Sequence, residues 1–137
     1  MNFKNIWFFG KSGTGKTREA YKIYIKTLIN FKTAKIVNEY DLLENHKIYL
    51  QKYLLIIDDV GVLQNKFEKE KIFGIYFNII DYRNKKGLTT VFTSKHDIKD
   101  FLVKVADFDI ELAHSLKSRL QGNYKKEFQG EDYRGVK

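Results

Sequence analysis

Two patterns of apolar residues alternate along the chain. Short continuous apolar runs, which are typical of strands buried on both faces, are separated by longer segments whose apolar residues recur every three or four positions, which is typical of amphipathic helices. The apolar runs, together with one stretch that alternates apolar and polar residues near the end, predict strands at 6–9, 35–37, 53–57, 88–94 and 124–129. The helical spacing predicts helices at 16–30, 40–50, 66–84, 97–105 and 109–121.

This alternation of strands and helices sets the expected fold class. Parallel strands need long crossover connections, and helices between them cover both faces of the resulting sheet. We therefore expect a three-layer α/β fold. No internal repeat, low-complexity tract or flexible linker divides the 137 residues, so a single domain over 1–137 is expected.

The first apolar run leads directly into the sequence G-K-S-G-T-G-K-T, which contains every specified position of a phosphate-binding loop. In such a loop, backbone N–H groups and a helix N-terminus surround the phosphates of a nucleotide. Lys16 would contact the β- and γ-phosphates, and the Thr17 hydroxyl would complete a Mg²⁺ site. The expected nucleotide-binding residues are Gly10, Lys11, Ser12, Gly13, Thr14, Gly15, Lys16, Thr17 and Arg18, and the expected cofactors are ATP or ADP with Mg²⁺.

An acidic pair, Asp58-Asp59, follows the apolar run Y-L-L-I-I. A buried strand that ends in carboxylates beside a phosphate loop is the Walker B arrangement, so Asp58 is expected to hold Mg²⁺ together with Thr17. Asp59 stands where a carboxylate that activates water is needed. We include Lys16, Asp58 and Asp59 among the expected catalytic residues.

Two further segments carry candidate side chains. The strand T-T-V-F-T-S-K ends in Thr93, Ser94 and Lys95, of which one is expected to face the γ-phosphate or the attacking water, with Ser94 as the catalytic candidate. Arg119, at the end of the 109–121 helix, has two explanations that the sequence leaves open. It is an arginine finger that reaches the nucleotide of a neighbouring subunit, or it complements the helix dipole.

Composition narrows the function classes. The chain has no cysteine, which excludes disulfides and thiolate metal sites, and its three histidines lack ligand-like spacing. No apolar run approaches about 18 residues, and the start leaves no room for a signal peptide, so a cytoplasmic protein without a membrane partner is expected. The formal net charge of +8 suits anionic partners such as single-stranded DNA, although a lysine-rich composition with solvated faces explains it equally well.

The ordered motifs resemble a known family. G-K-S-G-T-G-K-T, Y-L-L-I-I-D-D-V-G, I-I-D-Y-R, T-T-V-F-T-S-K, S-R-L and G-E-D-Y-R together resemble the AAA+ ATPases of bacterial and phage helicase loading, of the DnaC and DnaI type, and the IstB-like ATPases of transposition. The resemblance covers residues 3–134. It implies a parallel five-stranded sheet of order 5-1-4-3-2, and it matches Arg119 to the trans-acting finger. Arg83 matches a recurring position whose role the sequence does not explain.

Two departures from this pattern affect the expected activity. Loaders usually carry Asn at the sensor-1 position, where this chain has Lys95, and an ammonium group donates hydrogen bonds but cannot accept them. Hydrolysis is therefore expected to be slow. In addition, we expect a minimal AAA+ core, without the N-terminal region with which loaders grip the helicase and without a C-terminal lid.

These observations lead to one main reading and one alternative. The main reading is a loader-like ATPase of DNA replication or of phage and mobile-element DNA transactions. It would form an ATP-dependent homo-oligomer and act on a replicative helicase, a loader protein or single-stranded DNA. The alternative is a truncated binding module that engages a host helicase or loader and turns over little ATP. A small-molecule kinase fits less well, because no basic, arginine-bearing loop follows the central helices.

Overall fold

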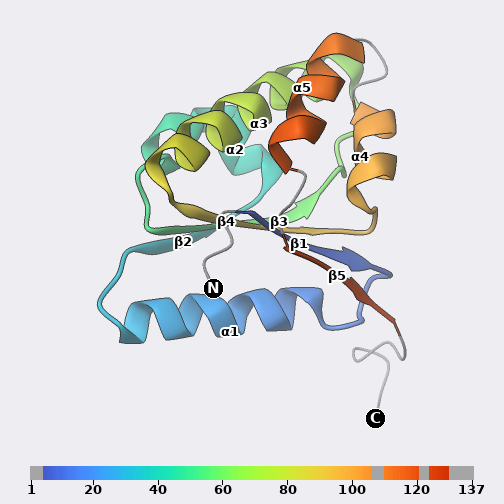
Figure 1. Ribbon diagram of the computed structural model, residues 1–137. Helices are drawn as coiled ribbons and strands as arrows, with labels where there is room; N and C mark the ends of the chain where they lie inside the picture. The colour runs from blue at the N-terminus through green and yellow to red at the C-terminus, as the bar shows by residue number, and fades with distance from the viewer. Residues whose placement is uncertain (1–4, 106–109, 121–123, 130–137) are drawn as a thin grey trace.

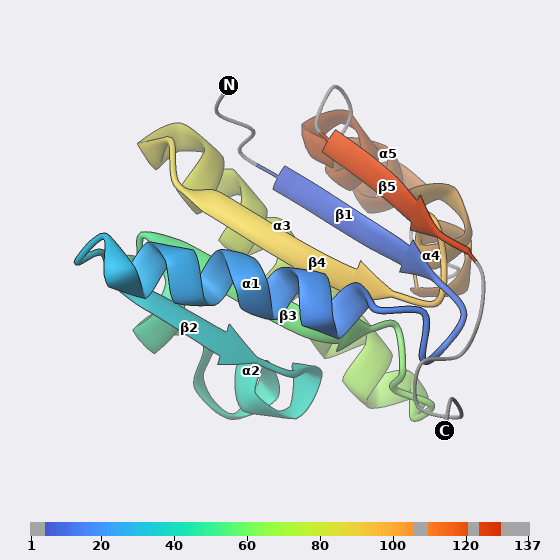
Figure 2. The same cartoon turned by 90° about the horizontal axis from the view of Figure 1, so that it is seen from below.

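The computed structural model describes residues 5–105, 110–120 and 124–129. Its strands form one parallel sheet with the order β2-β3-β4-β1-β5, which is the 5-1-4-3-2 order expected from the resemblance. Figure 2 shows the strands running side by side in the same direction. Their bounds are β1 Asn5–Gly10, β2 Ala34–Val37, β3 Leu54–Val60, β4 Thr89–Ser94 and β5 Tyr124–Phe128.

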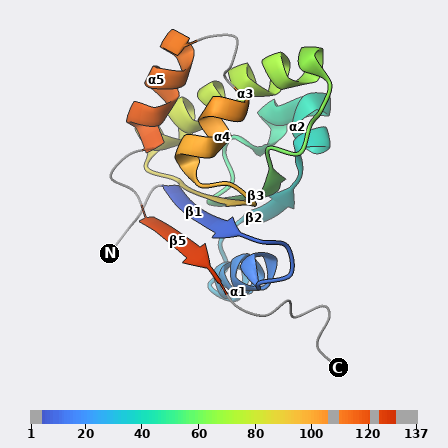
Figure 3. The ribbon, with the colours of Figure 1, turned by 90° about the vertical axis from the view of Figure 1, so that its right-hand side faces the viewer.

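Helices cover both faces of the sheet, as expected for a three-layer fold. Helix α1 lies alone on one face, and the other helices lie on the opposite face (Figures 1 and 3). The bounds are α1 Lys16–Ile29, α2 Glu39–Asn45, α3 Lys66–Lys86, α4 Ile98–Val105 and α5 Ile110–Leu120, with a 3₁₀ turn at His46–Tyr49. Within the described ranges, no helix combines the length and the apolar character that a bilayer crossing requires.

Each face of the sheet has its own apolar core, because successive strand residues point to opposite faces. On β1, Trp7 belongs to the large cluster beneath α2–α5, and Phe8 belongs to the smaller cluster beneath α1. The Trp7 ring packs against Phe92 and Phe101, with centroids 5.1 Å apart in each pair. Burial of both faces explains why the strands read as continuous apolar runs.

Local signals in the sequence account for several helix ends. The side chain of Asn38 caps α2 by accepting a hydrogen bond from Asp41 N, and the Asp41 carboxylate accepts one from Asn38 N, which completes a capping box. Asn65 caps α3 through Glu68 N. Gly87 ends α3 in the left-handed conformation, with φ 70°, a role that favours glycine.

The structure corrects two of the expected segments. The single helix expected over 40–50 is divided into α2 and the 3₁₀ turn, because Asn45 has φ −164° and ψ 85°, outside the helical region. The third strand does not end before the acidic pair. Strand β3 continues through Asp58 and Asp59 to Val60, with a shift in its pairing with β4 between Ile57 and Val60. Of the helix expected over 109–121, residues 109 and 121 lie outside the described residues.

Arg83, whose role the sequence left unexplained, lies fully buried near the end of α3. Its guanidinium donates to Thr90 Oγ1 at 2.7 Å and to the carbonyl oxygens of Leu50, Lys52 and Thr89 at 2.6–2.8 Å. Burial lowers the pKa of Arg83 to about 10, so the group still carries its charge at neutral pH. Arg83 therefore ties α3 to the segment before β3 and to the start of β4.

Candidate functional site

The segment between β1 and α1 is built on glycines that the backbone geometry requires. Gly15, which is the N-cap residue of α1, has φ 100° and, as a glycine, has no side chain to cap the N–H groups of the first helical turn. Gly10, at the end of β1, has φ 142°, and a Cβ atom at this position would overlap the carbonyl oxygen of Phe128 on β5. The helix N-terminus is thus open to an anion, and the loop entry packs directly against the neighbouring strand.

Lys16 and Thr14 hold the loop in shape from within. The Lys16 ammonium donates to the carbonyl oxygens of Gly10 and Lys11 at 2.6 and 2.7 Å, and only 8% of the residue is exposed. The Thr14 hydroxyl donates to the Lys11 carbonyl at 2.7 Å. This arrangement places a positive charge within the loop whose backbone would surround phosphates.

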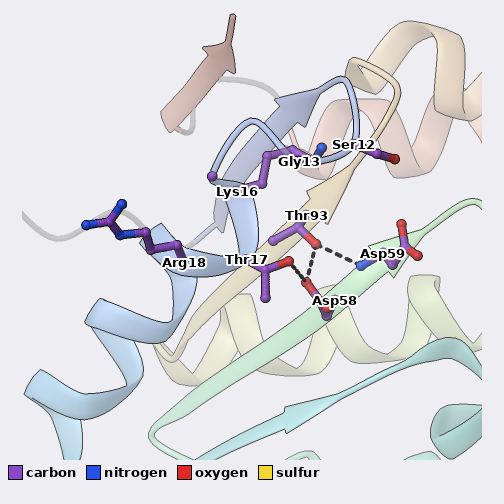
Figure 4. Close-up of a pocket in the computed structure, with 9 residues that line it drawn as sticks. Ser12, Gly13, Lys16, Thr17, Arg18, Asp58, Asp59 and Thr93 are labelled. Atoms are coloured by element: carbon purple, nitrogen blue, oxygen red, sulfur yellow. Dashed lines mark hydrogen bonds between the residues drawn. The ribbon is translucent and has the colours of Figure 1, made fainter. Parts of the chain in front are cut away.

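Three hydroxyl and carboxylate side chains from separate segments meet beside the loop. Thr17, at the start of α1, donates to Asp58 Oδ1 at 3.1 Å, and Thr93 on β4 donates to the same oxygen at 2.6 Å. The Thr93 hydroxyl also accepts a hydrogen bond from the backbone N–H of Asp59 at 2.7 Å. Figure 4 shows both threonine side chains converging on Asp58. The phosphate loop and the acidic pair, which lie about 40 residues apart in sequence, thus form one site.

A pocket of about 380 Å³ lies at this convergence (Figure 4). The Arg18 side chain extends away from Asp58 in that view. The lining residues are Ser12, Gly13, Gly15, Lys16, Thr17, Arg18, Asp58, Asp59 and Thr93. Of the loop residues expected to bind nucleotide, Gly10, Lys11 and Thr14 line a second cavity nearby instead. The residues expected to bind nucleotide are therefore divided between this pocket and the second cavity.

The three candidates at the end of β4 occupy different places. The side chain of Ser94, the catalytic candidate of this segment, is fully buried; its hydroxyl donates to Val60 O at 3.0 Å and accepts from His96 N at 3.1 Å. Lys95 lines the second cavity. The structure thus places Thr93, and not Ser94 or Lys95, at the pocket that holds Asp58 and Asp59. Successive residues of a strand point to opposite faces of the sheet, so adjacent residues at the end of β4 face different surroundings.

The residues at the convergence fit Mg²⁺ as it is held in nucleotide sites. Mg²⁺ prefers oxygen ligands and is bound by one or two carboxylates together with substrate phosphates and waters. The contact between Thr17 and Asp58 supplies one hydroxyl and one carboxylate at a common point. Within the described residues, no group of three or more His, Cys, Asp or Glu side chains forms a complete protein cage for a metal. The donor set therefore suits a metal that shares its coordination with phosphate.

Arg119 lies far from this pocket. Its carbonyl oxygen accepts from the side chain of Asn5, which begins β1, whereas the phosphate loop follows the other end of that strand. At about 3.3 Å per residue, the length of β1 corresponds to roughly 17 Å. Arg119 is therefore too remote to contact a nucleotide bound at the pocket of its own chain.

The Arg119 guanidinium contacts α3, which the sequence did not predict. Its Nε lies 3.1 Å from Asp81 Oδ1, and its central carbon lies 4.4 Å from the centre of the Phe77 ring. Hydrogen bonds from Lys85 and Arg119 lower the pKa of Asp81 below its usual value. No local motif marks Asp81 and Phe77 as partners, because they face Arg119 only once α3 and α5 have packed.

Comparison with known proteins places this geometry in context. No protein-family model matches the chain. An alignment of 107 residues, which covers 66% of this chain, shows 38% identity to a protein of insertion sequence IS232 from Bacillus thuringiensis subsp. berliner that is named an ATP-binding protein. The match spans 40% of the length of that relative.

Solved structures show the same fold at low sequence identity. The chain superposes on DnaI with a TM-score of 0.72 and 23% identity, covering 98% of this chain and 74% of that one. Its TM-score with the DnaC helicase loader is 0.68 at 16% identity, covering 92% and 78%. For the replication initiator DnaA bound to AMPPCP and single-stranded DNA, the TM-score is 0.72 at 19% identity, covering 93% and 41%. The chain therefore has the fold of a P-loop AAA+ domain and resembles the DnaI- and DnaC-type loaders and the IstB-like ATP-binding proteins.

Proposed function

We propose that this chain binds ATP or ADP with Mg²⁺ at the pocket beside the phosphate loop and hydrolyses ATP slowly. The observation that carries the proposal is the convergence of Thr17 and Thr93 on a single carboxylate oxygen of Asp58, directly beside the loop that contains Lys16. Three features meet here: the helix N-terminus after Gly15, the Lys16 ammonium group inside the loop, and the adjacent oxygens of Thr17 and Asp58. A turn with a purely structural role does not need all three at one place. The IS232 relative, named an ATP-binding protein, supports this choice of ligand.

Each side chain has a defined role in the proposal. Lys16 exchanges its contacts with the loop carbonyls for contacts with the phosphates, whose charge it offsets. Thr17 and Asp58 hold Mg²⁺, which neutralises charge on the transferring phosphoryl group when bound. Asp59 lines the same pocket and is the candidate that positions or activates the attacking water.

The biological role follows from the resemblance. We propose a loader-like AAA+ protein that acts in DNA replication or in mobile-element DNA transactions, with a replicative helicase, a loader protein or single-stranded DNA as partner. The IS232 relative supports the mobile-element setting, and the likeness to DnaI and DnaC supports the loader setting. ATP would promote self-association, because Arg119 lies at the amino ends of the strands and could complete only the site of a neighbouring copy.

The second candidate is a binding module that engages a helicase or loader with little turnover of ATP. One observation favours it: Lys95, at the sensor-1 position, lines the second cavity and not the pocket that holds Asp58 and Asp59. The chain then lacks the donor and acceptor that an asparagine would offer to the attacking water.

Steady-state ATP hydrolysis, measured with and without single-stranded DNA, separates the two candidates. The ATPase proposal predicts Mg²⁺-dependent turnover that Lys16→Ala removes and that DNA changes. The binding-module candidate predicts nucleotide binding by calorimetry without turnover above that of Lys16→Ala. If neither ATP nor ADP binds in the presence of Mg²⁺, both candidates are wrong.

A further inference from the structure

The backbone of β3 is distorted at the acidic pair. Asp59 has φ 61°, in the left-handed region that residues other than glycine seldom adopt, and the pairing of β3 with β4 shifts between Ile57 and Val60. Such bulges re-aim side chains and are common next to active sites. Since a conformation of this kind is costly, surrounding contacts must maintain it.

Side chains of the neighbouring strand β4 contact this distortion: the Ser94 hydroxyl donates to Val60 O at 3.0 Å, and Thr93 contacts the acidic pair itself. The Thr93 hydroxyl accepts the Asp59 N–H at 2.7 Å and donates its own hydrogen to Asp58 Oδ1 at 2.6 Å. Thr93 is only 1% exposed, so water cannot readily replace it. One hydroxyl group therefore fixes the backbone of one carboxylate residue and the side chain of the other.

The two carboxylate oxygens of Asp58 differ in their hydrogen bonds. Oδ1 accepts from both Thr17 and Thr93. Within the part of the chain that the structure describes, no hydrogen bond or ion pair occupies Oδ2 of Asp58. Because Oδ1 accepts the hydrogen bonds of both hydroxyl groups, Oδ2 is the Asp58 oxygen that remains to bind a metal ion.

We propose that Thr93 is a positioning residue for both carboxylates: it orients Asp58 so that Oδ2 meets the metal, and it holds the bulge that turns Asp59 into the pocket. This inference rests on the proposed Mg²⁺-nucleotide function. It adds a residue that acts through its neighbours and does not contact the phosphates. Partners of this kind typically change metal affinity or activity by about 10- to 100-fold when they are removed.

The test compares Thr93→Val, which keeps the shape but removes the hydroxyl, with Thr93→Ser, which keeps both the donor and the acceptor. Calorimetry gives the ADP affinity over a Mg²⁺ series and in EDTA. For Thr93→Val we expect the Mg²⁺ concentration for half-maximal tightening of ADP binding to rise about 10- to 100-fold, with unchanged affinity in EDTA. For Thr93→Ser we expect the wild-type Mg²⁺ dependence. If the valine variant does not fold, Thr93→Cys, whose thiol is a weak donor, replaces it in the same comparison.

The outcomes separate this inference from the proposed function. Lower thermal stability of Thr93→Val with a wild-type Mg²⁺ dependence would mean that the hydroxyl is only structural, and the inference would be overturned. The same holds if Thr93→Ser is impaired as strongly as the valine variant. If wild-type protein shows no Mg²⁺-dependent nucleotide binding, the proposed function itself fails, which the wild-type titration alone reveals.

Discussion

The hydroxyl of Thr17 lies 3.1 Å from Asp58 Oδ1, although the two residues are 41 positions apart in sequence. Thr17 is the second residue of α1, and Asp58 lies near the end of β3, which is separated from β1 by β4 in the sheet. The contact exists because the carboxyl ends of parallel strands share one edge of the sheet, where ligands of open α/β folds bind. The following predictions test the site built around this contact.

Replacement of Lys16 by alanine should weaken nucleotide binding strongly. A hydrogen bond to a charged group contributes about 1.5–3 kcal/mol, so the loss of the ammonium group should lower ADP affinity by about 10- to 150-fold. Calorimetric titration measures this loss. Lys22→Ala is the control, because Lys22 lies on the exposed side of α1 and forms a surface ion pair with Glu19. Equal affinities of Lys16→Ala and wild type would remove the loop from the proposed site.

Asp59→Asn should retain Mg²⁺-nucleotide binding but lose hydrolysis. Asp58 still holds the metal in this variant, whereas the carboxylate that positions water is absent. Asparagine tolerates the left-handed backbone conformation of Asp59 about as well as aspartate does, so the variant should unfold at the wild-type temperature. Asp59→Ala should lose both hydrolysis and some stability, because alanine is strained by about 1–2 kcal/mol at this φ. Undiminished turnover in Asp59→Asn would refute the role given to this carboxylate.

Arg119→Ala should lower ATP hydrolysis while leaving the nucleotide affinity of a monomer nearly unchanged. Mixing this variant with Lys16→Ala should restore part of the activity, since one junction then joins an intact loop to an intact arginine. Lys85→Ala is the matched control, because Lys85 also contacts Asp81 but lies on α3. Sedimentation with a slowly hydrolysed ATP analogue measures assembly. A monomer at all concentrations, with no rescue on mixing, would mean that Arg119 only helps to pack α5 against α3.

Arg83→Ala should destabilise the fold more than any surface substitution on the same helix. It leaves the carbonyl oxygens of Leu50, Lys52 and Thr89 without this donor, and each buried polar group that loses its partner costs about 1–3 kcal/mol. We expect a loss of about 3 kcal/mol or more in the free energy of unfolding, measured in urea. Lys86→Ala, at the exposed end of α3, should change it by less than about 0.5 kcal/mol. Comparable midpoints for the two variants would contradict the structural role of Arg83.

The sequence predicted the strand order through the resemblance and most element bounds through their apolar patterns, because both faces of the sheet are buried. It did not predict which residue after Phe92 faces the pocket. The run T-T-V-F-T-S has no polar and apolar alternation, so nothing in it sets the phase of the strand, and the bulge at Asp59 carries no glycine to mark it. The burial of Arg83 could not be predicted from the sequence either, because a basic residue near a helix C-terminus is normally exposed to solvent.

Gly10 affects how substitutions in the phosphate loop can be interpreted. It is the last residue of β1 to pair with β5, opposite Phe128, and within the described residues β5 is an edge strand that pairs with β1 alone. A side chain at Gly10 would force the two strands apart, so a Gly10→Ala protein that fails to bind nucleotide has not shown that the glycine contacts phosphate. In that variant the pairing of β5 with β1 is disrupted as well. Gly10 therefore belongs both to the end of the sheet and to the entrance of the phosphate loop. Substitutions that test contacts to phosphate should accordingly be made at Lys16 or Thr17.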